Sequence, residues 1–317
     1  LIMEKCADLL PEHFRFVRGV VDSPDLSLNI SRELLQHDRQ LKVIATNIEK
    51  KIKSELLKML GSDREKYEGF YKAFGPQLKY GVMAEYGRHK DTLKDLLLFY
   101  SSEGDKLCTL AEYTARMKDG QKEIYYATGE SVPKIAVLPQ TERVKDKGYE
   151  ILYFTEDVDE FAIQMMREYM DKPFKSINSG DLDLDTEEEK KEAEKKQEEN
   201  KDLLAFVKET LGDRITEAKI SHKLVSHPVC LTAGEHLSFE MEKYLNSFRQ
   251  DDEEAKADRI LELNPDHTVF AKLKDLHDSD KDRAKTYIDI LYHQALLMAG
   301  LPIEDPTAYS DLVFGLM

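Results

Sequence analysis

Residues 125–154 have the sequence YYATGESVPKIAVLPQTERVKDKGYEILYF, and this stretch decides the fold class. Tyr125–Ala127 is a short apolar run typical of a buried strand, and residues 131–147 have the pattern of a helix. Gly148 marks the end of that helix, and a second strand is predicted over Tyr149–Phe154. A strand, a helix and a strand in this order predict a parallel pair joined by a right-handed crossover. The sequence therefore predicts an α/β (α+β) fold.

The composition is that of a globular protein with a highly charged surface. The chain has 317 residues, of which 62 are acidic and 46 basic, giving a formal net charge of −16. This charge argues against nucleic acid or an anionic membrane as a partner, and no apolar run approaches the roughly 18 residues of a membrane span. The three cysteines are widely spaced, as is typical of reduced thiols, so we expect a cytoplasmic protein. Neither end resembles a natural terminus, and we expect the chain to belong to a longer protein.

Charge and periodicity divide the chain into four predicted parts. Residues 181–202 are almost entirely charged and have little to bury, so a charged linker is predicted there, with a solvated helix as the alternative. The predicted parts are 1–61, the end of a large subdomain with long helices; 62–175, a helical connector and a small α/β subdomain with parallel strands; 176–202, the charged linker; and 203–317, a C-terminal α/β domain ending in a helical hairpin.

The stretch Arg18–Gln36 contains the first candidate site. Its sequence predicts a buried strand end at residues 16–21, a turn at Asp22–Asp25, and a helix beginning at Asn29 or Ser31. Arg32 then lies in the first helical turn, where a cation opposes the helix dipole, and Gln36 follows one turn later on the same face. Such a local conflict beside a tight turn suggests that the arginine meets an anion, although first-turn arginines are often ordinary surface residues.

The motif VVDSPDLSLNISRELLQ over residues 20–36 resembles the middle-domain catalytic loop of the ninety-kilodalton heat-shock chaperone family, in its bacterial form. The resemblance continues, in family order, through Tyr125–Ser131, Lys147–Tyr153, Asp159–Phe161, Leu263–His267 and Ala295–Pro306. It implies that Arg32 reaches the γ-phosphate of ATP held by a separate N-terminal ATPase domain of the same protein, with Gln36 beside it. ATP and magnesium are then needed by the full-length protein, and this chain by itself has no cofactor and is not an enzyme.

A second candidate surface is a helix predicted over residues 160–170. Its apolar residues cover an arc of about 200°, wider than the roughly 100° that a core-facing helix needs. Interdomain packing is the alternative explanation of that width. The family resemblance implies that Glu160, Phe161 and Gln164 belong to a patch that binds partly unfolded client proteins.

A third candidate surface lies between Gly234 and Phe248. Leu237, Met241, Tyr244, Leu245 and Phe248 form one apolar stripe at helical spacing, and Phe239 lies off it. A helix of the domain core would show the same stripe. The resemblance implies that Leu237, Tyr244 and Leu245 contact clients.

The apolar pattern of the last two predicted helices is the basis for predicting a homodimer. Ala284, Ile288, Leu291, Ala295 and Met298 form a heptad-like seam, Asp305 and Pro306 begin a further helix, and Tyr309, Leu312, Val313 and Leu316 follow at helical spacing. Pairing of this hairpin across a twofold axis would give a four-helix bundle. Packing inside one chain is the alternative.

Other chemistry finds little support in the sequence. His222, His227 and Cys230 match no common metal-ligand spacing, and no phosphate-binding loop or nucleophile elbow is present. The sequence therefore favours a chaperone fragment that binds clients, dimerises and supplies Arg32 to an ATPase cycle. A homodimeric scaffold and, less favoured, a self-contained α/β enzyme are the alternatives.

Overall fold

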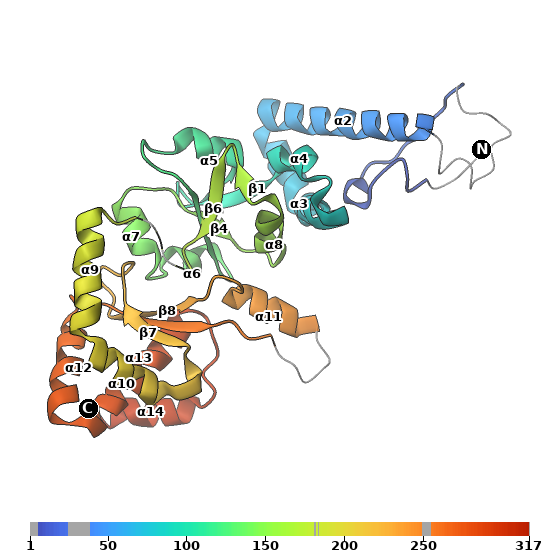
Figure 1. Ribbon diagram of the computed structural model, residues 1–317. Coiled ribbons are helices and arrows are strands. Elements are labelled where there is room, and N and C mark those ends of the chain that lie inside the picture. The colour runs from blue at the N-terminus through green and yellow to red at the C-terminus, as the bar shows by residue number, and fades with distance from the viewer. Residues whose placement is uncertain (1–5, 25–38, 181, 183, 249–254, 317) are drawn as a thin grey trace. The chain divides into compact units, whose positions relative to one another are not determined.

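The computed structural model describes residues 6–24, 39–180, 182, 184–248 and 255–316, and it confirms the predicted α/β (α+β) fold class (Figure 1). Its strands pair in both parallel and antiparallel directions. The chain forms two compact units. Unit 1 comprises Leu1–Tyr100, Lys106–Arg116 and Val158–Pro173, and unit 2 comprises Ser101–Asp105, Met117–Asp157 and Phe174–Met317.

Unit 1 is mainly helical. Its elements are η1 (Glu12–Phe14), α2 (Arg39–Ser62), α3 (Arg64–Gly87), α4 (Lys90–Leu93), η2 (Lys94–Leu96), β1 (Leu98–Ser101), β2 (Lys106–Thr109), α5 (Leu110–Arg116), α8 (Val158–Met166), β5 (Glu168–Tyr169) and the start of β6 (Lys172–Ser176). Helix α3 is central, because it packs against α2, α8 and η1. Its first turn is capped by Asp63, whose side chain accepts a hydrogen bond from the Lys66 N–H.

The strand end predicted at residues 16–21 is wrong. Phe16 instead packs its ring 5.0 Å from those of Phe70 and Phe74 on α3, while Val20 is 94% exposed. Apolar, β-branched residues favour an extended backbone, but a strand also needs a pairing partner. None of the strands in the described part of the chain pairs with this segment.

Unit 2 combines two sheets with a helical layer. Its elements are β3 (Ile124–Thr128), α6 (Val132–Ala136), α7 (Thr141–Asp146), β4 (Leu152–Phe154), α9 (Glu187–Glu199), α10 (Lys201–Leu211), η3 (Gly212–Arg214), β7 (Glu217–Ile220), β8 (Val229–Ala233), α11 (Phe239–Phe248), β9 (Arg259–Leu263), α12 (Thr268–Ser279), α13 (Lys281–Met298) and α14 (Pro306–Phe314).

The predicted strand–helix–strand unit is present. Strand β3 is parallel to β4, with Tyr126 aligned to Leu152, and also parallel to the end of β6. The connecting helix is divided into α6 and α7, and Gly148 follows it with a φ of +70°, a conformation that glycine adopts without steric cost. Burial of every β3 residue explains its uninterrupted apolar pattern.

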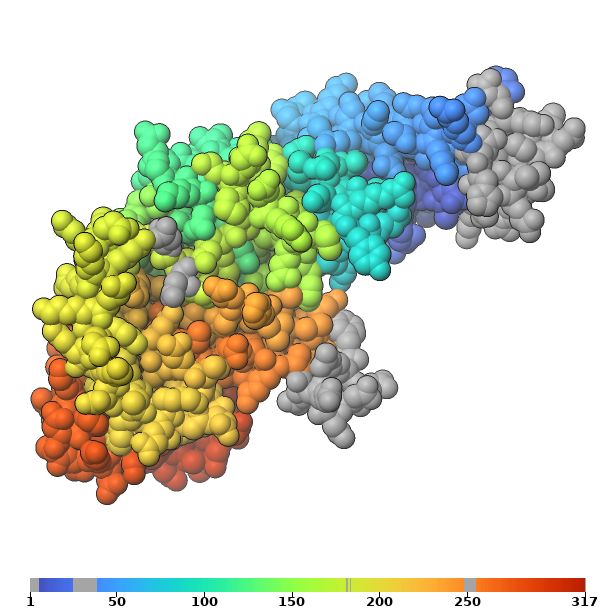
Figure 2. Space-filling view, viewed as in Figure 1, coloured from blue at the N-terminus to red at the C-terminus, as the bar shows by residue number. Residues whose placement is uncertain are grey.

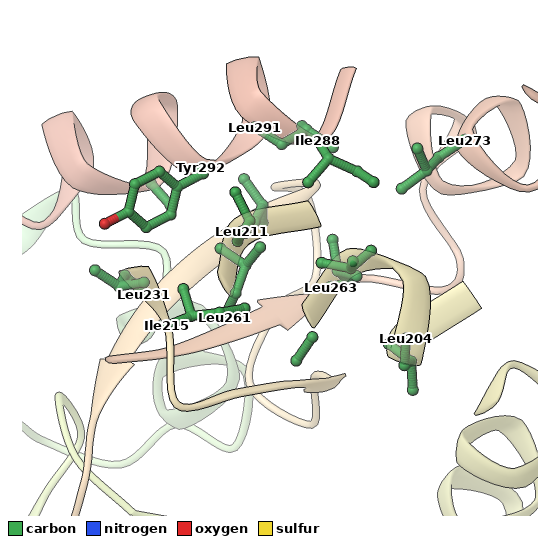
Figure 3. Packing of buried hydrophobic residues seen from close by; sticks show 14 of the residues in the cluster. Leu204, Leu211, Ile215, Leu231, Leu261, Leu263, Leu273, Ile288, Leu291 and Tyr292 are labelled. Carbon is green, nitrogen blue, oxygen red and sulfur yellow. The ribbon is translucent and has the colours of Figure 1, made fainter. Parts of the chain in front are cut away.

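The second sheet, with strand order β7-β9-β8, supports the largest core. Strand β9 is parallel to β7 and antiparallel to β8. Apolar side chains from this sheet meet those of α10, α12 and α13 in one buried cluster (Figure 3). The two sheets are tied together where the Ala233 N–H donates to the Asn178 carbonyl at 3.0 Å.

The tract predicted as a charged linker is helical between Glu187 and Glu199. Thr186 and Glu189 form a capping box, in which each side chain accepts a hydrogen bond from the other residue's backbone N–H. Lys196 pairs with Glu192 on the same face and also with Asp266. No α9 residue is buried, and the helix lies at the surface of unit 2 (Figure 2). The alternative interpretation, a solvated helix, describes this segment.

Candidate functional site

Arg32 and Gln36, the predicted ATP-contacting residues, lie outside the described residues. The predictions for these two side chains therefore stay predictions. The candidate surfaces that the structure does describe are on α8 in unit 1 and on α11, α13 and α14 in unit 2.

Helix α8 is fastened to α3 by a buried ion pair. Lys79 Nζ lies 2.5 Å from Asp159 Oδ1, and the two side chains are only 4% and 2% exposed. Lys79 Nζ also lies 4.9 Å from the centre of the Phe99 ring, within cation–π range. This pair fixes the start of α8, from which the predicted client residues follow.

The three predicted client residues on α8 differ in exposure. Glu160 is buried, Phe161 is half-buried and Gln164 is exposed. These residues occupy a single helical turn, so the structure brings their positions together. Only Phe161 and Gln164 present substantial surface.

The helix predicted to continue to residue 170 instead ends at Met166. Arg167 has a φ of +66°, and the chain then reverses through Met170 and Asp171, whose φ values are +50° and +57°. The antiparallel pairing of Tyr169 with Lys172 closes this hairpin. Two residues with positive φ between paired strands correspond to a type I′ turn, which usually contains Asn or Gly. The turn therefore lacks its usual sequence signal, and counting Tyr169 and Met170 as helical made the apolar arc too wide.

Helix α11 divides its apolar residues between the core and the surface. Ser238 caps it by accepting from the Met241 N–H, so Leu237 precedes the helix. Phe239, which lies off the predicted stripe, is buried in the cluster of unit 2, and Met241 is also buried. Leu237, Tyr244 and Leu245, the three predicted client residues, are half-buried. The side chain of Phe248 is outside the described set.

The heptad-like seam on α13 packs inside its own domain. Ile288, Leu291 and Ala295 are buried in the core cluster of unit 2, and Met298 packs partly against it (Figure 3). For Ile288, Leu291 and Ala295 the structure therefore supports the alternative of intramolecular packing. The three-stranded sheet supplies the partner that the sequence pattern does not identify, since α13 packs directly on β8.

Helix α14 has the opposite character, because none of its residues is buried. Asp305 caps it by accepting from the Ala308 N–H at 2.9 Å, and Pro306 occupies the first turn, as predicted. Tyr309, Leu312, Val313 and, just beyond the helix, Leu316 are half-buried, and Phe314 is 68% exposed. Tyr309 stacks on His293 of α13 with 5.3 Å between ring centres. Much of the apolar surface of α14 thus remains at the surface of one chain.

Glu142 of α7 binds the loop before β8 in a contact that the sequence did not predict, and we call this contact the acidic clasp. Glu142 accepts hydrogen bonds from the Val225 and Ser226 N–H groups, at 2.8 and 3.0 Å, and contacts His227 Nδ1 at 2.8 Å. Partial burial favours a higher pKa, but a hydrogen bond from the Ser226 hydroxyl, together with those from the two N–H groups and His227, outweighs it and lowers the pKa of Glu142 to about 2. Its partners are more than eighty positions away in the chain, at Val225, Ser226 and His227. No local pattern marks such a pairing.

Comparison with known proteins identifies the family. A family model described as "Hsp90 protein" matches residues 1–317. The chain is 57% identical to the chaperone protein HtpG of Bacillus subtilis, and 57% and 56% identical to those of Clostridium acetobutylicum and Clostridium perfringens. Each alignment covers all 317 residues of this chain and 50% of the relative. The chain belongs to the Hsp90 family.

This Hsp90-family chain spans about half the length of the curated relatives it matches. The resemblance found in the catalytic-loop motif is confirmed at the level of the family, and the relatives named above are chaperone proteins HtpG. Within the described ranges, no helix is both long enough and apolar enough to cross a membrane.

Proposed function

We propose that this chain is the client-binding and dimerising part of an ATP-dependent HtpG-type chaperone. Its partners are partly unfolded proteins, a second copy of itself and the N-terminal ATPase domain of the full-length protein. The observation that carries the proposal is the division of α11, where Phe239 is buried in the core while Tyr244 and Leu245, on another face, remain half-buried; Leu237, just before the helix, is half-buried as well. A helix needs only about 100° of apolar arc to hold its place in a core, so the remaining apolar face is available to a partner.

Client binding is tested by replacing one residue on each described surface. Phe161→Ala combined with Leu245→Ala should reduce the ability of the chain to prevent aggregation of a partly unfolded protein, because both substitutions remove apolar contact area. Light scattering of a thermally unfolding reporter enzyme measures the protection. The matched control, Val20→Ala with Tyr86→Ala, removes two side chains that are 94% and 98% exposed outside the proposed surfaces. Equal protection by the double variant and the parent would count against client binding.

The proposed role of Arg32 belongs to the full-length protein. A guanidinium is permanently charged and planar, so it can neutralise charge that develops on the γ-phosphate during transfer. In the full-length protein, Arg32→Ala should lower ATP turnover while nucleotide affinity is nearly unchanged, and Gln36 is expected to assist beside it. The 317-residue chain alone should neither bind ATP tightly nor hydrolyse it. Unchanged turnover in the full-length variant would reject the role.

Dimerisation is proposed to use α14. Leu312→Asp with Val313→Asp places charge on its half-buried apolar face, whereas Ser310→Asp places charge at an exposed position of the same helix and serves as the control. Multi-angle light scattering at micromolar concentration should give twice the 36.6 kDa chain mass for the parent and the control, and the single mass for the double variant. A monomeric parent would refute the dimer.

Two alternatives are separated by the same experiments. A structural homodimeric scaffold would dimerise but would not protect a client, and a self-contained α/β enzyme would turn over a substrate without an added ATPase domain. We place the protein in the cytoplasm, supported by three free cysteines, of which Cys108 and Cys230 are buried.

A further inference from the structure

A cavity of about 250 Å³ lies in unit 2 between the parallel strand–helix unit and the three-stranded sheet. Apolar side chains from both sides form most of its wall, among them Ile135, Leu231, Phe239 and Met298. Val137 and Leu297, which are 73% and 55% exposed, also line it. The volume is below the roughly 300–1,000 Å³ of sites that enclose whole small ligands, so it suits one large side chain and its adjoining peptide group.

One polar group in this wall lacks a partner. Gln140 is 3% exposed, and its Nε2 donates to the Leu231 carbonyl at 2.9 Å. Because a carbonyl only accepts, the amide nitrogen must face Leu231, which leaves Oε1 as the remaining polar atom. Gln140 Oε1 has no hydrogen-bond partner among the described residues. A buried acceptor left unpaired costs about 1–3 kcal/mol on general grounds, so it calls for a donor.

The charged residues at the cavity do not call for an ionic ligand. Lys134 is paired with Glu130, and Lys243 Nζ lies 2.8 Å from Glu240 Oε1. The other polar wall groups are neutral, and Asn178 already accepts from the Thr128 N–H. A neutral occupant that combines an apolar group with one N–H donor therefore fits best.

We propose that this cavity binds one large apolar residue of an extended, unfolded polypeptide, whose own peptide N–H donates to Gln140 Oε1. The proposal deepens the client-binding function proposed above and rests on it. The site is distinct from the α11 surface of Leu237, Tyr244 and Leu245, because Phe239, Glu240 and Lys243 line the cavity from a different face of that helix.

Short blocked peptides test the cavity directly on the 317-residue chain. The probe is an acetylated, amidated pentapeptide with Phe between glycines, and its binding is followed by methyl NMR signals of Ile135 and Met298. Replacing Phe by Ala should weaken binding about tenfold or more, because a buried large apolar side chain contributes at least that factor. Val137→Asp at the exposed rim should also weaken binding, whereas Val20→Asp, the same change at an exposed valine of unit 1, should not.

The role of Gln140 is tested through the probe as well as the protein. Methylating the Phe nitrogen, or replacing that amide by an ester, removes the donor and should weaken binding to the parent severalfold. The penalty from the ester should disappear in Gln140→Met, whose folding is checked by circular dichroism. If Gln140→Met fails to fold, the ester and N-methyl probes on the parent still decide.

Several outcomes would overturn the proposal. These are unchanged signals of Ile135 and Met298, equal binding of the Ala peptide, or an ester peptide that binds as well as the amide. The last result would mean that solvent satisfies Gln140 Oε1. The client-binding proposal fails separately, if Phe161→Ala with Leu245→Ala protects as well as the parent while the cavity still binds the Phe peptide.

Discussion

The buried ion pair between Lys79 and Asp159 gives the sharpest prediction, because removing one partner leaves the other charge buried without a counter-ion. Lys79→Met keeps the length and apolar stem of the side chain but leaves the Asp159 carboxylate, 2% exposed, without its cation. Breaking a pair of this kind costs about 3–5 kcal/mol. With a urea dependence of about 2 kcal/mol per molar, the unfolding midpoint of unit 1 should fall by about 2 M.

The assay needs a probe that reports unit 1 alone. The chain contains no tryptophan, so Phe161→Trp, introduced into every protein of the series, supplies a single fluorophore on α8. Asp159→Leu should destabilise unit 1 as much as Lys79→Met does, because it leaves the buried ammonium group of Lys79 without its anion. The double variant should lie close to the parent, since an apolar pair of similar volume replaces a buried ion pair at little cost. A midpoint shift under 0.5 M for Lys79→Met, or additive losses in the double variant, would refute this reasoning.

Three further predictions follow from single contacts. Burial, reinforced by the neighbouring His89, lowers the pKa of His13 to about 4. Because the unfolded chain then binds more protons than the folded one, the free energy of unfolding of unit 1 should fall by about 1.4 kcal/mol per pH unit as the pH drops from 6.5 towards 4. His13→Gln should remove that part of the pH dependence. Glu142→Gln should destabilise unit 2 by about 1–2 kcal/mol at neutral pH. Because the pKa of Glu142 is lowered to about 2, the difference in stability between the parent and this variant should shrink as the pH falls below 4.5. Urea titrations at several pH values measure the stabilities in both predictions. Thr186→Ala should cost about 1 kcal/mol by loss of the α9 cap, seen as faster hydrogen exchange in α9.

Residue preferences over short stretches of sequence predicted those elements whose conformation depends mainly on neighbouring residues. The parallel β3–β4 unit was predictable because strand, helix and Gly148 each follow a strong residue preference, and the whole unit lies within about thirty residues. The cap at Asp305 and Pro306 was predictable for the same reason. The hairpin at Met170 and Asp171 was not, because these residues adopt positive φ values without the usual Asn or Gly signal.

Long-range contacts account for the remaining differences. The seam containing Ile288, Leu291 and Ala295 has the spacing of an assembly helix, but that spacing does not distinguish a second copy from a sheet of the same domain. The acidic clasp of Glu142 depends on a loop more than eighty positions away, and the pair of Lys79 with Asp159 joins helices eighty positions apart. The family resemblance predicted functional positions, but it did not indicate which of them the core would bury.

Two of the described helices that carry candidate surfaces, α11 and α13, also contribute to the core, and this dual use has a physical consequence. Helix α11 buries Phe239 and α13 buries Ile288, while Tyr244 and Leu297 on the same two helices retain exposed surface. Since a stripe of about 100° is enough to hold a helix against the core, the opposite face can change with little effect on stability. A core helix also loses little conformational entropy when a partner binds, because its backbone is already ordered. Substitutions on the outer faces should therefore alter binding, and those on the inner faces should alter folding first.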